Sequence, residues 1–360
     1  MKRVHNFSAG PCTLPLKVLE ETQSEFLNFA NNGMSIIEDS HRGPSYEKIH
    51  QDALASFRRL ADVPDDFAVL FLQGGATLQF AQTAMNLLAT DETAGYVNTG
   101  VWGQKALEDA LRVANVYEAW TGQESGFTRT PETNEINIKQ DTKWIHITSN
   151  ETIGGVRFEQ SPDLDIPLVA DMSSDFLSRS IDWDKFDLVY GGAQKNLGPA
   201  GLVIVIVRRE SLGKHGRNLP TYLDYQFHDK NDSLGNTPPM FPIYVMGKVL
   251  EWMEKNGGLE EFERRAGIPK DVAALVEEMT DVSTTLSLVN IDPVESKKVI
   301  IQIGAYGEHQ ATTVEMYGEV LSVDNSSFTV HLEPGCGARL LIHNDRYVNK
   351  PSLTHPWGRA

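Results

Sequence analysis

The sequence predicts an α/β protein with a mostly parallel sheet and helices on both of its faces, followed by an atypical all-β C-terminal region. Between residues 69 and 257, short β-branched runs alternate with helical patterns, which is typical of a parallel sheet. From residue 282 onward, short β-rich runs follow one another without helices between them. With 360 residues the chain has room for about two domains, which we place at residues 1–265 and 281–360.

The elements of the first domain follow from local patterns. Pro15 and Pro44 each open an amphipathic helical pattern, since proline is favoured in the first turn of a helix. Residues 1–15 are expected to pack with a small domain. Strands are expected at residues 69–72, 96–97, 116–119, 145–148, 166–170, 188–190 and 202–207, and further helices after Gly74, at 103–113 and at 243–257.

The C-terminal part has a different sequence pattern, in which β-rich runs replace the alternation of strands and helices. Residues 266–280 are expected to form a helical connector, with a helix at 269–280. Short β-rich runs follow at residues 286–291, 298–303, 312–316, 320–323, 328–332 and 339–342. Turn sequences such as Asp324-Asn325-Ser326 separate them, which predicts an antiparallel meander or sandwich of uncertain role.

Composition narrows the class of protein. A hydrophobic fraction of 41% and a charged fraction of 22% are ordinary for a globular protein, and no apolar run is long enough to span a membrane. The N-terminus lacks the apolar segment of a signal peptide, so a cytoplasmic protein is expected, with Cys12 and Cys336 reduced. A net charge of −17 disfavours nucleic-acid partners. The ten histidines are scattered, so no metal site is assigned.

Lys195 is the first candidate for chemistry. A strand at 188–190 leads into Gly191, Gly192 and Ala193, and another strand begins after Gly201. The sequence therefore predicts a strand, a tight turn that carries the lysine, and a second strand, with small neighbours that leave the amine reachable. A protonated lysine does not attack a carbonyl group, so a nucleophilic lysine needs a lowered pKa or is already held as an imine.

Asp171 is the second candidate, because it follows the apolar run 166–170 directly. The carboxyl ends of parallel strands are where open α/β sheets bind their ligands. A lysine and an aspartate at that edge fit pyridoxal 5'-phosphate, whose ring nitrogen requires a carboxylate partner. A surface lysine in a loop is the plain alternative for Lys195 taken alone.

Three other stretches carry candidate residues. Ser40-His41-Arg42-Gly43 is a polar loop that is either a solvated turn or an anion-binding element. The Gly74-Gly75 turn leads from a strand into a helix and can present backbone N–H groups to an anion. Trp102 follows a strand end, where it either stacks on a planar ring or packs in the core.

The order of these motifs resembles the phosphoserine aminotransferase family, pyridoxal-phosphate enzymes of fold type I. The resemblance covers about residues 3–265 and rests on eight ordered motifs: Asn6-Phe7-Ser8-Ala9-Gly10-Pro11, Ser40-His41-Arg42-Gly43, Gln73-Gly74-Gly75-Ala76-Thr77, Gly100-Val101-Trp102, Asn150-Glu151-Thr152-Ile153-Gly154-Gly155, Ala170-Asp171-Met172-Ser173-Ser174, Gly192-Ala193-Gln194-Lys195-Asn196-Leu197-Gly198-Pro199-Ala200-Gly201 and Asn236-Thr237-Pro238-Pro239. The tail beyond residue 265 does not match the family.

The resemblance implies a role for each matching residue. Lys195 and Asp171 are implied as catalytic, and His41 and Arg42 as substrate-binding. The cofactor-binding residues implied are Ala76, Thr77, Trp102, Thr152, Asp171, Gln194, Lys195, Asn236 and Thr237. Asn236 and Thr237 would reach the cofactor phosphate of the neighbouring subunit, which implies a homodimer with shared active sites.

The activity implied is reversible transfer of an amino group from glutamate to 3-phosphohydroxypyruvate in serine biosynthesis. The phosphorylated four-carbon analogue of vitamin B6 synthesis is a further substrate of the family. A cysteine desulfurase-like or alanine:glyoxylate-type enzyme of the same fold type is a second enzymatic interpretation. Because the family's C-terminal substrate arginine and His-Arg pair are not found here, another alternative is a cofactor-binding but catalytically impaired chimera whose β-module binds carbohydrate or is structural.

Overall fold

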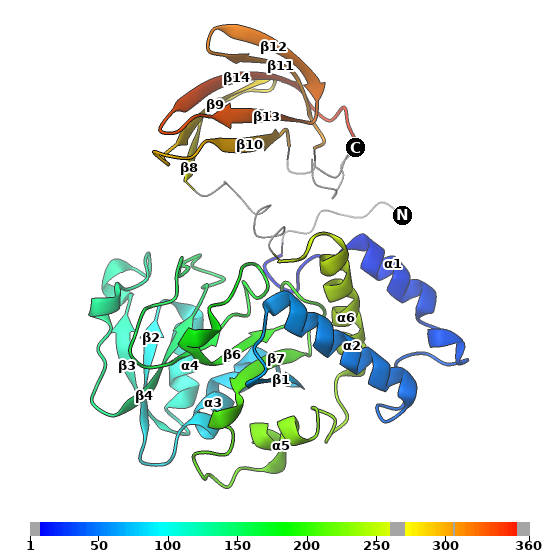
Figure 1. The fold of residues 1–360 in the computed structure, drawn as a ribbon, viewed down its shortest axis with the longest axis vertical. Helices are drawn as coiled ribbons and strands as arrows, with labels where there is room; N and C mark the ends of the chain where they lie inside the picture. Colours follow the sequence, from blue (N-terminus) through cyan, green and yellow to red (C-terminus); the bar gives the residue numbers. More distant parts are fainter. Residues whose placement is uncertain (1–7, 260–270, 305–306, 351–360) are drawn as a thin grey trace. The chain divides into compact units, whose positions relative to one another are not determined.

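The computed structural model describes residues 8–259, 271–304 and 307–350. The chain divides into two compact units, Met1–Glu263 and Arg264–Ala360. The first unit is an α/β structure and the second consists of strands (Figure 1). Among the described residues, no helix combines the length and hydropathy that a bilayer span requires.

The first unit is built on a seven-stranded sheet in the order β1-β7-β6-β5-β4-β2-β3. Strands β2 to β6 pair in parallel, and β7 lies antiparallel to both β6 and β1. The strands are β1 (Phe67–Leu72), β2 (Thr93–Asn98), β3 (Asn115–Thr121), β4 (Thr142–Thr148), β5 (Leu168–Asp171), β6 (Phe186–Gly192) and β7 (Val203–Arg208). The predicted mostly parallel sheet is confirmed.

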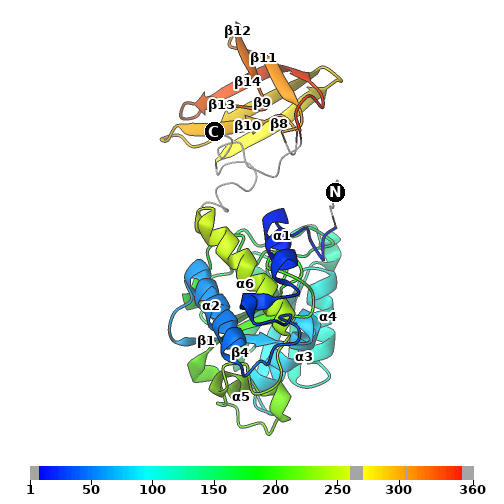
Figure 2. The same ribbon diagram turned by 90° about the vertical axis from the view of Figure 1, so that its right-hand side faces the viewer.

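Helices cover both faces of this sheet (Figure 1, Figure 2). One core lies between the sheet and the pair α2 and α6, and the other between the sheet and α3, α4 and α5. The helices are α1 (Leu16–Glu25), α2 (Pro44–Ala61), α3 (Gly75–Leu87), α4 (Val101–Ala110), α5 (Tyr225–Lys230) and α6 (Met240–Lys255). Short 3-10 turns occur at Phe29–Asn31, Gln123–Ser125, Thr133–Glu135, Trp183–Lys185, Arg209–Ser211 and Thr221–Leu223.

The two buried faces explain the apolar runs of the strands. On β7, Val203, Val205 and Val207 belong to one core, while Ile204 and Ile206 belong to the other. Side chains alternate between the faces of a strand, so a strand buried on both sides is apolar at every position. Because the parallel strands share one direction, Leu72, Asn98, Thr148, Asp171 and Gly192 end at the same edge of the sheet.

The second unit is an antiparallel β-structure, as the sequence predicts. A five-stranded sheet has the order β12-β11-β14-β9-β8, and β10 pairs with β13. The strands are β8 (Val272–Met279), β9 (Ser283–Asn290), β10 (Lys297–Gln302), β11 (Gln310–Met316), β12 (Glu319–Asn325), β13 (Ser327–Leu332) and β14 (Gly337–Asp345). Residues of both sheets, such as Val299, Leu332 and Leu340, share one core, which makes the unit a small sandwich.

The predicted helix at 269–280 is wrong over its described part. Val272–Met279 is the edge strand β8, which pairs antiparallel with β9, and residues 260–270 lie outside the described residues. The run Ala273-Ala274-Leu275-Val276-Glu277-Glu278 has high helix propensity. Only Val272 of this strand is buried, so burial does not explain the strand. The backbone pairing with β9 overrides the local preference.

Candidate active site

Lys195 lies in a tight turn between β6 and β7. The carbonyl oxygen of Ala193 accepts N–H groups from Leu197 and Gly198 at 3.1 and 2.7 Å, and the N–H of Ala193 donates to Leu202 at 3.0 Å. These bonds fold the chain back after one turn. The predicted order of strand, lysine-bearing turn and strand is confirmed.

The Lys195 side chain is enclosed by small and polar neighbours. A methyl group on Gly10 would lie 3.2 Å from its Cγ, and its Nζ donates a hydrogen bond to the Thr152 hydroxyl. The amine also lies 5.9 Å from the centre of the Trp102 ring. Burial lowers the pKa of Lys195, although the charge of Asp171 opposes this effect. A lowered pKa makes the unprotonated, nucleophilic amine more accessible near neutral pH.

Asp171 is the last residue of β5, and its side chain is buried between β4 and β6. Its Oδ1 accepts the N–H of Ser173 at 2.8 Å. Burial raises its pKa to about 6, and the Ser173 hydrogen bonds and the charge of Lys195 only partly offset this. A cationic ring nitrogen placed beside this carboxylate would compensate its buried negative charge.

Trp102 is positioned by Glu151, a residue to which sequence reasoning gave no role. Glu151 is fully buried, and its two carboxylate oxygens accept the N–H groups of Trp102 at 3.0 Å and Gly103 at 2.8 Å. Negative charge is stabilising at this end of α4 because the first N–H groups of a helix have no partner within it. The indole Nε1 of Trp102 is buried without a hydrogen-bond partner in the described structure.

Replacement of Glu151 with alanine is expected to lower the free energy of unfolding of the cofactor-free protein by about 2–4 kcal/mol, because two buried N–H groups lose a charged acceptor. Thermal and urea denaturation would measure the loss. Glu151→Gln keeps one acceptor oxygen and should lose less. Equal stability of the alanine variant and the wild type would contradict this role for Glu151.

The turn between β1 and α3 offers an anion site. Gly74 and Gly75 have φ angles of +89° and +61°, and α3 begins at Gly75. Ala76 and Thr77 therefore occupy the first turn of the helix, where backbone N–H groups have no intrahelical acceptor. A phosphate at this position would accept those N–H groups and also interact with the helix dipole.

Gly74→Ala is expected to weaken binding of pyridoxal phosphate by about tenfold or more, because the φ angle of +89° is unfavourable for alanine and a methyl group would lie 2.6 Å from Leu78 Cδ2. Gly33→Ala is the matched control, since Gly33 has a φ of +84° but no atom within 4 Å of the added methyl. Cofactor titration of both variants would measure the effect. Equal losses in the two variants would show that the turn geometry at Gly74 is not used.

The other predicted cofactor residues fall into two groups. The main-chain oxygen of Gln194 accepts the N–H of Cys12 at 2.9 Å, so the segment from Gly10 to Cys12 lies against the lysine turn. The prediction that residues 1–15 pack with a small domain is not tested by this contact, and residues 1–7 lie outside the described range.

The second group of predicted cofactor residues, Asn236 and Thr237, is exposed. The Thr237 carbonyl oxygen accepts a hydrogen bond from Gln73 Nε2 at 2.8 Å, beside the Gly74 turn.

The predicted substrate residues, His41 and Arg42, are not bonded to this constellation. Arg42 is exposed, and its guanidinium makes no ion pair within the described structure. His41 is partly buried, and its Nε2 has no hydrogen-bond partner among the described residues. No hydrogen bond or ion pair links either side chain to Lys195 or Asp171 in residues 8–259. Neither the Arg42 guanidinium nor His41 Nε2 is therefore engaged by a side chain of these catalytic residues.

These residues fit pyridoxal phosphate. The sheet edge brings together an amine with a lowered pKa, a buried carboxylate, a ring that can stack and a glycine turn with free N–H groups. Each matches one part of the cofactor: the carbonyl carbon, the ring nitrogen, the ring face and the phosphate. The fold and the site define a pyridoxal-phosphate-dependent transferase of fold type I.

The sequence profile of aminotransferase class V matches residues 4–316, and the chain belongs to this family. It is 48% identical over 265 residues to the phosphoserine aminotransferase of Bacillus subtilis (strain 168), covering 74% of each chain. It is 46% identical over 293 residues to that of Nitrosomonas europaea, covering 79% of each. The predicted family is confirmed, and the profile match extends beyond residue 265.

Solved structures agree with this assignment. Phosphoserine aminotransferase from Bacillus circulans subsp. alkalophilus superposes with a TM-score of 0.70 at 42% identity, over 79% of this chain and 83% of that one. Pyridoxal-phosphate-bound phosphoserine aminotransferase from Trichomonas vaginalis gives 0.68 at 36% identity, over 72% and 78%. The protein is a transaminase, its cofactor is pyridoxal phosphate, and the non-catalytic alternative is not favoured.

Proposed function

We propose that the protein transfers an amino group reversibly between glutamate and 3-phosphohydroxypyruvate, the reaction that forms phosphoserine in serine biosynthesis. The observation that carries this proposal is the placement of Lys195 against Thr152 and Trp102 at the sheet edge where Asp171 is buried. The similarity to phosphoserine aminotransferases supports the choice of substrates.

The chemistry divides between the cofactor and the chain. Bound pyridoxal phosphate supplies a carbonyl carbon that bonds amines and a ring that accepts electrons. Lys195 Nζ takes the α-proton of the amino acid and returns it, since its lowered pKa favours the free amine. Thr152 holds Nζ in place through its hydroxyl group. Asp171 keeps a proton on the ring nitrogen, and the Gly74 turn binds the phosphate through its N–H groups.

Substrate anions are recognised in this proposal by His41 and Arg42. The Arg42 side chain is exposed, and the buried Nε2 of His41 has no hydrogen-bond partner among the described residues, so a phosphate or carboxylate would supply one. Gln194 contributes to cofactor phosphate binding. Asn236 and Thr237 are exposed, as required if they reach the cofactor phosphate of a second subunit in a homodimer. The protein would act in the cytoplasm, and the β-unit that begins with β8 at Val272 would form a separate domain.

The test is an absorbance titration of the full chain with pyridoxal phosphate, then with glutamate, and finally with 3-phosphohydroxypyruvate. We expect a visible band of bound cofactor that glutamate converts to the aminated form and 3-phosphohydroxypyruvate restores. Hydroxypyruvate, which lacks the phosphate, is the matched control and should restore the band far more slowly. Equal rates with both acceptors would overturn the phosphorylated substrate, and a band unaffected by glutamate would overturn the transaminase reaction.

A further inference from the structure

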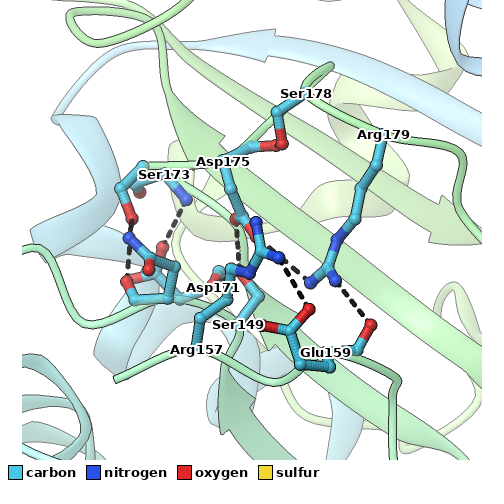
Figure 3. Close-up of polar contacts among 10 residues, drawn as sticks. Ser149, Arg157, Glu159, Asp171, Ser173, Asp175, Ser178 and Arg179 are labelled. Carbon is cyan, nitrogen blue, oxygen red and sulfur yellow. Dashed lines mark hydrogen bonds and ion pairs between the residues drawn. The ribbon is translucent and has the colours of Figure 1, made fainter. Parts of the chain in front are cut away.

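A second carboxylate, Asp175, lies close to the end of β5. Its side chain is only 9% exposed, and its Oδ1 accepts the Ser149 hydroxyl proton at 2.5 Å. The same hydroxyl oxygen lies 3.0 Å from the main-chain oxygen of Asp171, and the Ser149 N–H donates to that oxygen at 2.9 Å. Figure 3 shows Ser149, Asp171 and Asp175 grouped in this way. Ser149 therefore fixes the distance between the Asp175 carboxylate and the end of β5.

Arg179 is the counter-ion of Asp175. Its Nη2 lies 3.3 Å from Asp175 Oδ2, and its Nη1 donates to the Glu159 carbonyl at 2.8 Å (Figure 3). Arg157 pairs with the exposed Glu159 carboxylate at 2.7 Å. The positive charge is thus on the outer side of Asp175, while Asp171 lies on the inner side.

Two further bonds hold this arrangement. Asn150 Nδ2 donates to Ser174 Oγ at 2.7 Å, and Ser174 Oγ donates to the Asn150 carbonyl at 2.8 Å. The loop after β4, which carries Thr152, is therefore joined to the loop after β5, which carries Asp175. The Asp175 side chain, held by Ser149 between two bonded loops, therefore has little freedom to move away from the end of β5.

The groups around Asp171 shift its pKa in both directions. Burial and the charge of Asp175 raise its pKa, and Lys195 lowers it. Tyr190 on β6 faces Asp171, and it is neutral because its pKa is strongly raised. The Tyr190 hydroxyl is hydrogen-bonded to His146 on β4, and burial lowers the pKa of His146 to about 3. Burial raises the pKa of Asp175 itself, while Ser149, Arg179 and Arg157 oppose this.

We propose that Asp175 is a positioning residue whose buried negative charge, fixed by Ser149 and balanced by Arg179, strengthens the binding of a protonated ring nitrogen beside Asp171. The inference rests on the proposed role of Asp171. Asp175 repels the Asp171 carboxylate in the cofactor-free protein, and a cation placed beside Asp171 relieves that repulsion. A neutral ring atom at the same position would gain nothing from Asp175.

The test is a thermodynamic cycle between residue 175 and the ring nitrogen. The cofactor-free full chain is titrated at pH 8 with pyridoxal phosphate and with its 1-deaza analogue, in which carbon replaces the ring nitrogen. Asp175→Asn is expected to weaken binding of pyridoxal phosphate about three- to tenfold and to leave the analogue unchanged, since one pKa unit corresponds to a factor of ten. Asp163→Asn, a surface charge with 93% side-chain exposure, is the control.

Each outcome decides between roles. Equal losses for both ligands, or no loss for either, would overturn the inference, because a structural role does not distinguish nitrogen from carbon. If the wild type binds both ligands with equal affinity and Asp171→Asn changes neither affinity, the role of Asp171 in the proposed function is overturned. The inference about Asp175 is then overturned as well, because it rests on that role. A wild-type preference for pyridoxal phosphate that Asp175→Asn leaves intact would overturn the inference alone.

Arg179 gives an independent measurement if Asp175→Asn does not fold. Arg179→Met removes the outer positive charge, so the preference for pyridoxal phosphate over the analogue is expected to rise about two- to threefold. Arg179→Lys retains the charge and should restore the wild-type preference. An unchanged or reduced preference in Arg179→Met would contradict the proposal.

Discussion

Replacement of Lys195 with alanine is expected to reduce kcat for transamination by at least about 10³-fold, because the group that moves the α-proton is lost. The structure places the Lys195 amine on the Thr152 hydroxyl and 5.9 Å from the Trp102 ring centre. The rate of 2-oxoglutarate formation from glutamate would measure the loss. The visible band of the covalently bound cofactor should also disappear, although phosphate contacts at the Gly74 turn would still bind pyridoxal phosphate reversibly.

Lys105 provides the matched control for this prediction. Its Nζ lies 4.7 Å from the centre of the same Trp102 ring, yet the residue is exposed on α4. Lys105→Ala removes a lysine from the same neighbourhood and is expected to keep the visible band and most of kcat. If Lys105→Ala lost as much activity as Lys195→Ala, the assignment of the proton transfer to Lys195 would be wrong.

Asp171→Asn is expected to have opposite effects on cofactor binding and on the stability of the cofactor-free protein. Loss of the charged partner should weaken pyridoxal phosphate binding by about 10²-fold, as for other buried charge pairs. The same substitution should stabilise the cofactor-free protein at pH 8 by up to about 3 kcal/mol, because the pKa of Asp171 is raised from 3.8 to about 6 by burial.

The difference in stability between the wild type and Asp171→Asn is expected to depend on pH. Below about pH 4, Asp171 is protonated in both the folded and the unfolded chain, so the wild type and the variant should be equally stable. Between pH 4 and 6 the unfolded chain releases this proton while the folded chain keeps it, so the wild type loses stability as the pH rises. Above pH 6 the difference should be constant. Urea denaturation across this range would measure it.

Asp187→Asn tests whether an aspartate that is only partly buried would behave in the same way. Burial also raises the pKa of Asp187, but Asp187 lies at the start of β6, and its Oδ1 is 3.5 Å from Arg208 Nε. This substitution should leave cofactor affinity unchanged. A stability difference for Asp171→Asn that did not vary with pH would contradict the raised pKa.

Much of the site could be predicted from the sequence because its determinants are local. The small residues around Lys195, the apolar run that ends at Asp171 and the Gly74-Gly75 turn each specify a strand end within a few positions. Parallel strands of one sheet end at one edge, so local strand ends already imply that these residues converge. The fold type and the all-β texture of the C-terminal unit follow from the same local periodicity.

Other features depend on contacts between distant segments. Glu151 caps α4 from 48 positions away, and Ser149 reaches Asp175 across 26 positions, spacings with no local signature. Val272–Met279 is a strand because β9 pairs with it, although its residues favour a helix. The elements and the residues at their ends follow from local sequence, because propensity and periodicity act over a few residues. Which buried charges meet depends on the folded chain, because pairing and burial join segments that lie far apart in the sequence.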